Sequence, residues 1–254
     1  MLCQIKEVLI ISTPHDIELF KELFGIGDKL GMKFSYAVQK KPNGIAEAFK
    51  IGEDFIKNDN IALILGDNIF YGHSFNQILL KNKKMIETSG GSVIFGYYVK
   101  DPSSYGVIEF DKNGRIEKII EKPKKTVSNF AVPGLYFFDN QAVKIAKNLK
   151  PSPRGELEIT DIINKYINNK KLNVEILHRE MTWLDAGTTD HLLEAGNFIK
   201  AIQSRQGIYT GCIEEIAFMN GWITRNDLIK LSDTYKTEYG EYLKYIAGEK
   251  NNGI

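Results

Sequence analysis

Hydrophobic and polar positions alternate in blocks along the first hundred residues of the chain. Short, nearly continuous apolar runs are typical of strands that are covered on both faces of a sheet. Such runs occupy residues 7–13, 34–39, 61–65 and 91–99. The segments between them carry apolar side chains at helical spacing, and they span residues 14–27, 42–56 and 74–88. This order of strands and helices predicts a mostly parallel sheet with helices on both faces.

The pattern changes in the middle of the chain. Residues 105–123 are predicted to form two alternating strands on either side of "DKNG", which is a hairpin turn signal. Further strands are expected at 129–139, 172–178 and 182–188, with helices between them. We expect one domain over residues 1–254, with an α/β core of about residues 1–190 and a largely helical C-terminal region of about 191–254.

Composition narrows the class of protein. The chain is 43% hydrophobic and 26% charged, which is typical of a globular domain, and its net charge of +1 argues against a nucleic-acid partner. Two cysteines give no disulfide framework, and the four histidines show no zinc-ligand spacing. No apolar run reaches membrane-spanning length, and residues 1–12 lack the features of a signal peptide. A cytoplasmic protein without a membrane partner is expected.

One carboxylate follows a predicted strand directly. The segment "IALILGDNIFYGH" places Gly66 and Asp67 after the apolar run of residues 61–65. In open α/β sheets, ligands bind outside the carboxyl ends of the strands, where a carboxylate suits a hard cation that carries phosphate oxygens. Asp before Asn is also ordinary turn chemistry, and on this stretch alone the turn is the favoured interpretation.

Eight short motifs occur along the chain in a fixed order. They are "VQKKPNGIAEAF", "LILGDNIFYGH", "YGVIEFDKNGRI", "EKP", "GLYFFDN", "NLKPSPRGELEITDI", "WLDAGT" and "EEIAF". Together they resemble the glucose-1-phosphate thymidylyltransferases, sugar nucleotidyltransferases that make dTDP-glucose from dTTP and glucose 1-phosphate for deoxysugar and rhamnose synthesis. The resemblance covers essentially the whole chain. It implies a Rossmann-like mixed, mostly parallel α/β sheet flanked by helices, a helical C-terminal tail, and a homo-oligomer, which in the family is a tetramer.

The resemblance assigns a metal to the carboxylate after the strand. In the family, the aspartates of "LGDN" and "WLDxGT" hold Mg²⁺ between them, and here these are Asp67 and Asp185. Catalysis of phosphoryl-type transfer depends mostly on positioning the substrates and neutralising their charge. Mg²⁺ binds one or two carboxylates, and phosphates and waters fill its other positions. No protein nucleophile or general base is required, because the attacking sugar phosphate is already ionised. We expect the two carboxylates to converge within roughly 10 Å of each other.

The same resemblance assigns the substrate contacts. Gln39 and Gly44 match the segment that recognises thymine, where an amide can pair with an imide edge. Glu121 and Lys122 of "EKP" match the residues that bind the sugar hydroxyls and the sugar phosphate, and Lys122 is counted among the catalytic residues. The remaining matches line the sugar pocket, and they are Gly106 after Tyr105, Val132, Gly134, Tyr136 and Trp183. Several of these positions also have ordinary explanations as core or strand-end residues.

The chain departs from the family at its start. Family members open with a strand, a glycine-rich "GGxGTRL" loop and a "KxLLPIxxKP" segment, and no stretch of this sequence matches either motif. Roughly forty residues are expected to be missing, including the loop that cradles the triphosphate. Two alternatives stay open: a uridylyl- or cytidylyltransferase, or a catalytically inactive remnant that keeps the sugar-phosphate half of the site.

We predict that this chain, expressed as written, has negligible thymidylyltransferase activity and poor solubility. Nothing in it replaces the amides and cations that bind the triphosphate, and the loss of an interior strand leaves open sheet edges. A segment with the glycine-rich loop, supplied in cis or as a separate chain, should recover both properties. The measurement is pyrophosphate release from dTTP and glucose 1-phosphate. Turnover of about 1–10³ per second, the usual enzyme range, would contradict the prediction.

Overall fold

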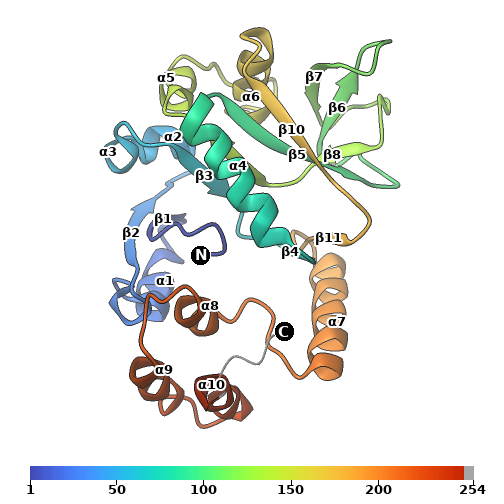
Figure 1. Cartoon of the computed structure of the whole chain (residues 1–254). Coiled ribbons are helices and arrows are strands. Elements are labelled where there is room, and N and C mark those ends of the chain that lie inside the picture. Colours follow the sequence, from blue (N-terminus) through green and yellow to red (C-terminus); the bar gives the residue numbers. More distant parts are fainter. Residues whose placement is uncertain (249–254) are drawn as a thin grey trace. The chain divides into compact units, whose positions relative to one another are not determined.

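The computed structural model describes residues 1–248 and divides the chain into two compact units (Figure 1). One unit combines Met1–Ala37 with the described residues from Leu192 onward, and the other spans Val38–His191. The expected single domain stays a prediction. Within the described residues, no helix has the length and apolar composition needed to cross a membrane.

The first unit holds a small sheet and most of the C-terminal helices. Its strands are β1 (Glu7–Ser12) and β2 (Lys33–Val38), connected by α1 (Ile17–Phe24) and the short 3-10 helix η1 (Asp28–Leu30). Its helices are α7 (Thr189–Gln206), α8 (Ile213–Met219), α9 (Arg225–Ser232) and α10 (Glu238–Gly248). Leu228 of α9 and Leu243 of α10 are fully buried in one core with Leu30 of η1. The predicted helical C-terminal region is confirmed.

The second unit is built on a seven-stranded sheet. The strands follow the order β3-β9-β5-β8-β6-β7, and β10 pairs with β5 outside this path. They are β3 (Ile61–Ile64), β5 (Ser92–Tyr98), β6 (Gly106–Phe110), β7 (Ile116–Glu121), β8 (Phe130–Val132), β9 (Leu135–Phe138) and β10 (Leu172–Leu177). A separate ribbon pairs β4 (Asn68–Gly72) with β11 (Met181–Asp185). The helices are α2 (Glu47–Ile51), α3 (Glu53–Ile56), α4 (Phe75–Ser89), α5 (Gln141–Lys147) and α6 (Ile159–Asn168).

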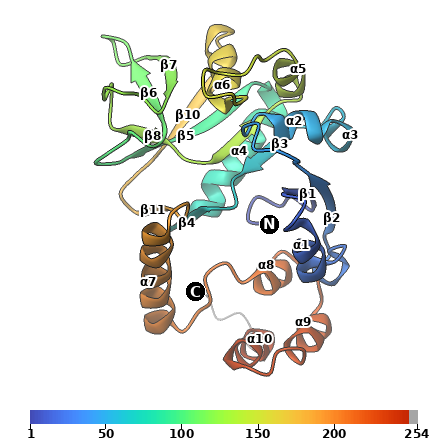
Figure 2. The ribbon, with the colours of Figure 1, turned by 180° about the vertical axis from the view of Figure 1, so that it is seen from behind.

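Helices cover both faces of this sheet. On one face, Ile94 of β5 and Phe138 of β9 pack with Ile162 of α6, and all three are fully buried. Side chains alternate along a strand, so their neighbours Phe95 and Phe137 point to the opposite face, where their rings lie 6.2 Å apart. Helix α4 contacts β5 and β9 and crosses the sheet on that second face (Figures 1 and 2). The mixed α/β class is confirmed.

The directions of the strands differ from the prediction of a mostly parallel sheet. β10 and β5 run parallel, whereas β9 pairs antiparallel with both β3 and β5, and β6 pairs antiparallel with β7 and β8. Residues 129–139, which were expected to form one strand, run antiparallel to β5 on both sides of Pro133. Pro133 has no N–H to donate to a ladder, and the segment breaks there into β8 and β9. β9 lies between β3 and β5 and is antiparallel to both.

The apolar run of residues 61–65 predicts a strand that is covered on both faces. Strand β3 differs from this prediction. It is the terminal strand of the seven-stranded sheet, and its residues alternate between half-buried and exposed. The side chain of Ile64 is 57% exposed, so an apolar group stands beside an open row of backbone groups. The polar loop expected after Asp67 contains β4, whose pairing with β11 the sequence did not indicate.

We predict that Ile64→Lys reduces aggregation of the chain. A lysine on an exposed edge strand disfavours edge-to-edge pairing, and a surface substitution changes stability by only about 0.5 kcal/mol. Light scattering at increasing protein concentration measures the effect. The matched control is Leu63→Lys on the same strand, which places a charge among core side chains and should unfold the unit. Unchanged aggregation of Ile64→Lys would show that β3 is not the self-associating edge.

Candidate active site

The backbone pairing of β4 with β11 brings two carboxylates together. Asp185, the last residue of β11, lies opposite Asn68, the first residue of β4. One step beyond this pair, the N–H of Ala186 donates to the carbonyl oxygen of Asp67 at 2.8 Å. Asp67 and Asp185 are therefore at the same end of one antiparallel ribbon.

The two carboxylates flank a common point above Gly187. A Cβ atom built on this glycine would lie 2.9 Å from Oδ1 of Asp185 and 3.5 Å from Oδ2 of Asp67. The Gly187 N–H donates to Oδ1 of Asp185 at 2.8 Å, so the turn after β11 fixes that carboxylate. The expected convergence of the two side chains is present in the structure, while their role as metal ligands stays a prediction.

Asn68 holds three parts of the site in place. Its amide Nδ2 donates to Oδ1 of Asp67 at 2.7 Å. Its carbonyl Oδ1 accepts from the Trp183 indole N–H at 2.7 Å and from the Gly134 N–H at 2.8 Å. A Cβ on Gly134 would lie 2.6 Å from Leu65 and 2.9 Å from Asn68, so this position needs glycine. Asn68 thus orients a carboxylate, an indole and the kink between β8 and β9.

Tyr105 contacts the second carboxylate. Its hydroxyl donates to Oδ2 of Asp185 at 3.3 Å, and its ring meets the ring of Trp183 edge-on, with centroids 4.9 Å apart. Burial and the neighbouring Asp185 carboxylate raise the pKa of Tyr105 to about 12, so the hydroxyl stays protonated at neutral pH. His191 Nδ1 lies 3.7 Å from the same Oδ2. Both oxygens of Asp185 therefore have neighbours that fix the plane of the carboxylate.

Three of the predicted sugar-binding residues lie on strands β6, β7 and β8. Gly106 of β6 pairs with Glu121 of β7 on one side and with Val132 of β8 on the other. A Cβ on Gly106 would lie 3.5 Å from Oε2 of Glu121 and 3.1 Å from Thr160, so the glycine keeps the carboxylate accessible. The Val132 side chain is buried in the core, which leaves its backbone as the part nearest the site.

The Glu121 carboxylate is partly buried next to other acidic groups. Burial first, and then the nearby Glu158 carboxylate, raise the pKa of Glu121, while Lys122 and Arg154 oppose the shift. Arg154 lies 3.5 Å from Glu121 and 2.9 Å from Glu156, and its guanidinium also reaches Glu158 at 3.6 Å. The arginine is thus shared among three carboxylates and does not neutralise Glu121 completely.

Lys122 and Tyr136 connect this region with the paired aspartates. The Lys122 N–H donates to the carbonyl of Tyr105 at 2.9 Å, and its φ of +41° is rare for a residue with a side chain. Tyr136 is fully buried, and burial, with smaller effects from the Glu121 and Asp67 carboxylates, raises the pKa of its phenol. Both carboxylates therefore act on the Tyr136 phenol, although burial has the larger effect on its pKa.

The segment predicted to bind the base is held mainly by its own hydrogen bonds. Gln39 Nε2 donates to the carbonyl of Gly44 at 3.1 Å and to Oε2 of Glu47 at 2.8 Å. Gly44 has a φ of +99°, and a Cβ there would collide with the backbone of Leu157. The structure therefore gives Gly44 a packing role, and it leaves the Gln39 carbonyl as the group of that amide open to a ligand. Leu157 in turn connects this segment to Glu158.

Asn68 and Arg154 were not predicted as functional, and the contact of Tyr105 with Asp185 was not predicted either. Asn68 follows Asp67 directly in "LGDN", Tyr105 precedes Gly106, and Arg154 lies within "PRGELE". Each one stands inside a motif that the family resemblance had already marked. Their partners are the carboxylates of Asp67, Asp185 and Glu121, and these contacts depend on the register of β4 with β11 and on the path of residues 150–158.

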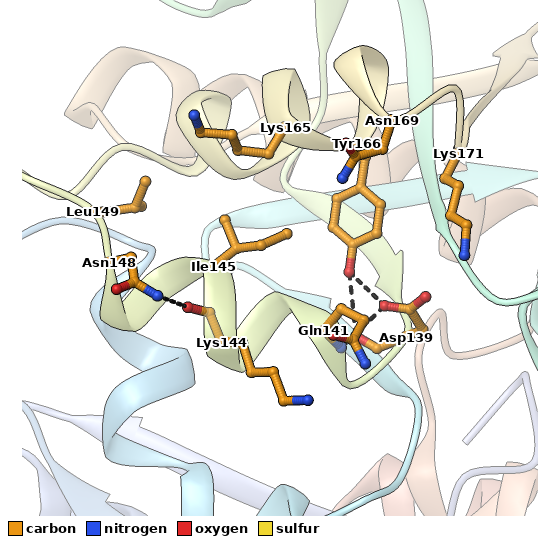
Figure 3. A pocket seen from close by; sticks show the side chains of 10 residues that line it. All are labelled: Asp139, Gln141, Lys144, Ile145, Asn148, Leu149, Lys165, Tyr166, Asn169 and Lys171. Carbon is orange, nitrogen blue, oxygen red and sulfur yellow. Dashed lines mark hydrogen bonds between the residues drawn. The ribbon is translucent and has the colours of Figure 1, made fainter.

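A second hollow lies elsewhere in this unit and contains none of the predicted residues. It measures about 580 Å³ and lies between α5 and α6 (Figure 3). Its polar centre is Tyr166, whose hydroxyl donates to the Asp139 carboxylate. The side chains of Lys144, Lys165 and Lys171 extend from different elements in different directions (Figure 3). Across residues 1–248, no cluster of three or more histidine, cysteine or acidic side chains forms a metal cage.

Comparisons with known proteins identify the family of the chain. A family model described as nucleotidyl transferase matches residues 1–202. A glucose-1-phosphate thymidylyltransferase of Neisseria gonorrhoeae is 48% identical over 250 residues, which cover 98% of this chain and 86% of that protein. A glucose-1-phosphate thymidylyltransferase of Mycolicibacterium smegmatis is 46% identical over 244 residues, which cover 96% of this chain and 83% of that protein.

A solved structure extends the similarity to three dimensions. It is described as a glucose-1-phosphate thymidylyltransferase from Bacillus anthracis in complex with sucrose. It is 36% identical, has a TM-score of 0.69, and the match covers 77% of each chain. By the extent of the family model and the identity of these relatives, the chain belongs to the glucose-1-phosphate thymidylyltransferases, within the nucleotidyl transferase family.

Proposed function

We propose that this chain provides the sugar-phosphate and metal sites for thymidylyl transfer from dTTP to glucose 1-phosphate, which yields dTDP-glucose and pyrophosphate. The observation that carries the proposal is the pair Asp67 and Asp185 at one point, connected through Tyr105 to Gly106 and Lys122. The proposal includes Mg²⁺, a cytoplasmic location and a homo-oligomer, a tetramer by family resemblance.

The donor set around Gly187 fits a magnesium ion. Mg²⁺ prefers one or two carboxylates and leaves its other positions to waters and substrate phosphates. Asp67 and Asp185 supply two carboxylates, and within the described residues Oδ2 of Asp67 accepts no hydrogen bond, which leaves it open to a cation. When bound, the ion would neutralise charge on the phosphates.

The residues of the chain have separate tasks in the proposed reaction. The Lys122 ammonium neutralises the sugar phosphate, because a charge-assisted contact of this kind is among the strongest polar contacts. The Glu121 carboxylate accepts hydrogen bonds from sugar hydroxyls beside Gly106, where the missing side chain leaves room. An oxygen of the sugar phosphate attacks the α-phosphorus of dTTP, and pyrophosphate leaves with its electron pair. The attacking oxygen is already ionised, so no side chain has to remove a proton.

We predict that Lys122→Ala weakens binding of glucose 1-phosphate by about tenfold or more. The substitution removes a contact to a charged phosphate, which contributes about 1.5–3 kcal/mol. Calorimetry with glucose 1-phosphate and Mg²⁺ measures the affinity, and thermal unfolding measures stability, which should change little. Lys112→Ala in the β6–β7 hairpin is the matched control and should bind normally. Equal affinity in Lys122→Ala would remove the lysine from the phosphate site.

We predict that Glu121→Gln binds the sugar more weakly but raises the melting temperature at pH 7.5. A carboxyl whose pKa is higher in the folded than in the unfolded chain destabilises the fold above both pKa values, and this cost disappears below the unfolded pKa. The gain in melting temperature should therefore shrink as the pH falls towards about 4. A lower melting temperature of the variant at pH 7.5 would show that its contact with Arg154 outweighs the burial of charge.

The proposed function is tested by nucleotide choice. The chain is joined to a segment with the glycine-rich loop, and pyrophosphate release is followed with glucose 1-phosphate and dTTP, UTP or CTP. Preference for dTTP supports the proposal, and preference for UTP or CTP supports the uridylyl- or cytidylyltransferase alternative. No turnover with any nucleotide, together with calorimetric binding of glucose 1-phosphate, would favour the inactive remnant. Without sugar-phosphate binding the proposal fails.

A further inference from the structure

We propose that Tyr105 is a positioning residue that couples binding of the sugar to binding of the divalent cation. This inference rests on the proposed function, since it assumes that the paired aspartates bind a cation and that Gly106 and Glu121 line the sugar site. Tyr105 has bonded contacts on both sides, through its side chain to the aspartates and through its backbone to the sugar-binding strands.

The side chain of Tyr105 contacts the Asp185 carboxylate directly and is linked to the Asp67 carboxylate through Trp183 and Asn68. Its hydroxyl donates directly to Oδ2 of Asp185, at 3.3 Å. Its ring packs on Trp183, whose indole N–H donates to Asn68, and Asn68 donates to Oδ1 of Asp67. A shift of the Tyr105 ring would therefore change the position of the Asp185 carboxylate through a single contact and that of the Asp67 carboxylate through a chain of three contacts.

The backbone of Tyr105 is tied to the sugar side. Its carbonyl accepts from the N–H of Lys122 at 2.9 Å, and the next residue, Gly106, is paired with both Glu121 and Val132. Lys122 holds a φ of +41°, so this hydrogen bond fixes a backbone conformation that the residue would not adopt alone. A sugar that contacts Gly106 and Glu121 would order this junction and, with it, the Tyr105 side chain.

This arrangement has a thermodynamic consequence. If the sugar favours the position of Tyr105 that orients Asp185, it tightens cation binding, and the cation must tighten sugar binding by the same factor. Second-sphere hydrogen bonds that orient metal-bound carboxylates typically change metal affinity 10–100-fold. The 3.3 Å contact is long, so we expect an effect at or below the lower end of that range.

The test uses a sugar that cannot contact the cation. Methyl α-D-glucopyranoside carries no phosphate, so any effect on metal affinity has to pass through the protein. The 254-residue chain, kept in solution as a thioredoxin fusion, is titrated with Mn²⁺, and free Mn²⁺ is measured by electron paramagnetic resonance with and without the sugar. Tyr105→Phe removes the hydroxyl and keeps the ring on Trp183. Tyr98→Phe, at an exposed position on β5, is the matched control.

We expect the sugar to tighten Mn²⁺ binding to the unmodified chain and to Tyr98→Phe by at least about threefold, near the low end of usual coupling factors. In Tyr105→Phe, Mn²⁺ alone should bind about three- to tenfold more weakly, and the sugar should no longer change its affinity. Lack of a sugar effect in the unmodified chain, or the same effect in Tyr105→Phe, overturns the coupling. After either result, the proposed function still stands if the chain binds Mn²⁺ and glucose 1-phosphate. If the chain binds neither ligand, the proposed function is overturned together with the coupling.

Discussion

The register between β4 and β11 is the constraint on which the site depends. Side chains alternate along a strand, so a slip of one residue would turn Asp185 to the other face of the ribbon and away from Asp67. Several contacts oppose such a slip. Asn68 binds Trp183 across the pair, and Ala186 donates to the carbonyl of Asp67 just beyond it. The two carboxylates are thus held near each other by the hydrogen bonds of the ribbon, although two like charges repel.

Holding two carboxylates at one point is unfavourable unless other groups compensate. Here the compensation comes from neutral donors, because Asn68, Tyr105 and the Gly187 N–H each donate to one of the two carboxylates. Donors of this kind orient the acids without neutralising them, so the attraction for a cation is preserved. This is how a site can be organised before its ligand arrives, which reduces the reorganisation needed during the reaction.

Much of the fold was predictable from the sequence, because the periodicities that carry it are local. The helix at 74–88, the hairpin around "DKNG" and the helical C-terminal region follow directly from such patterns. The directions of the strands were not predictable, because the insertion of β9 between β3 and β5 is a long-range pairing that local periodicity does not report. β4 was missed for a similar reason: its five residues look like a loop until β11, more than a hundred residues later, pairs with them. Long-range pairing of this kind leaves almost no local signal.

The candidate site, like the fold, was only partly predictable from the sequence. Family motifs indicated Asp67, Asp185, Glu121 and Lys122, since each lies within a short conspicuous segment. The residues that hold them in place were not evident, because a role such as that of Asn68 exists only when Trp183 and Gly134 come within reach. Sequence motifs therefore mark where chemistry is expected. The hydrogen bonds that make it possible are a property of the assembled strands.

The substrate side of the site combines features that lower the stability of the empty protein. Lys122 holds a positive φ, and Glu121 is partly buried near Glu158, with one arginine shared among three acids. A phosphate beside Lys122 would add a partner for the lysine, and sugar hydroxyls would donate to Glu121, so a bound sugar phosphate satisfies groups that the fold alone leaves poorly matched. A ligand that binds the folded state in this way also stabilises it. The same residues that make the empty site costly are therefore those by which the sugar phosphate would be recognised, which is the usual relation between stability and function at a binding site.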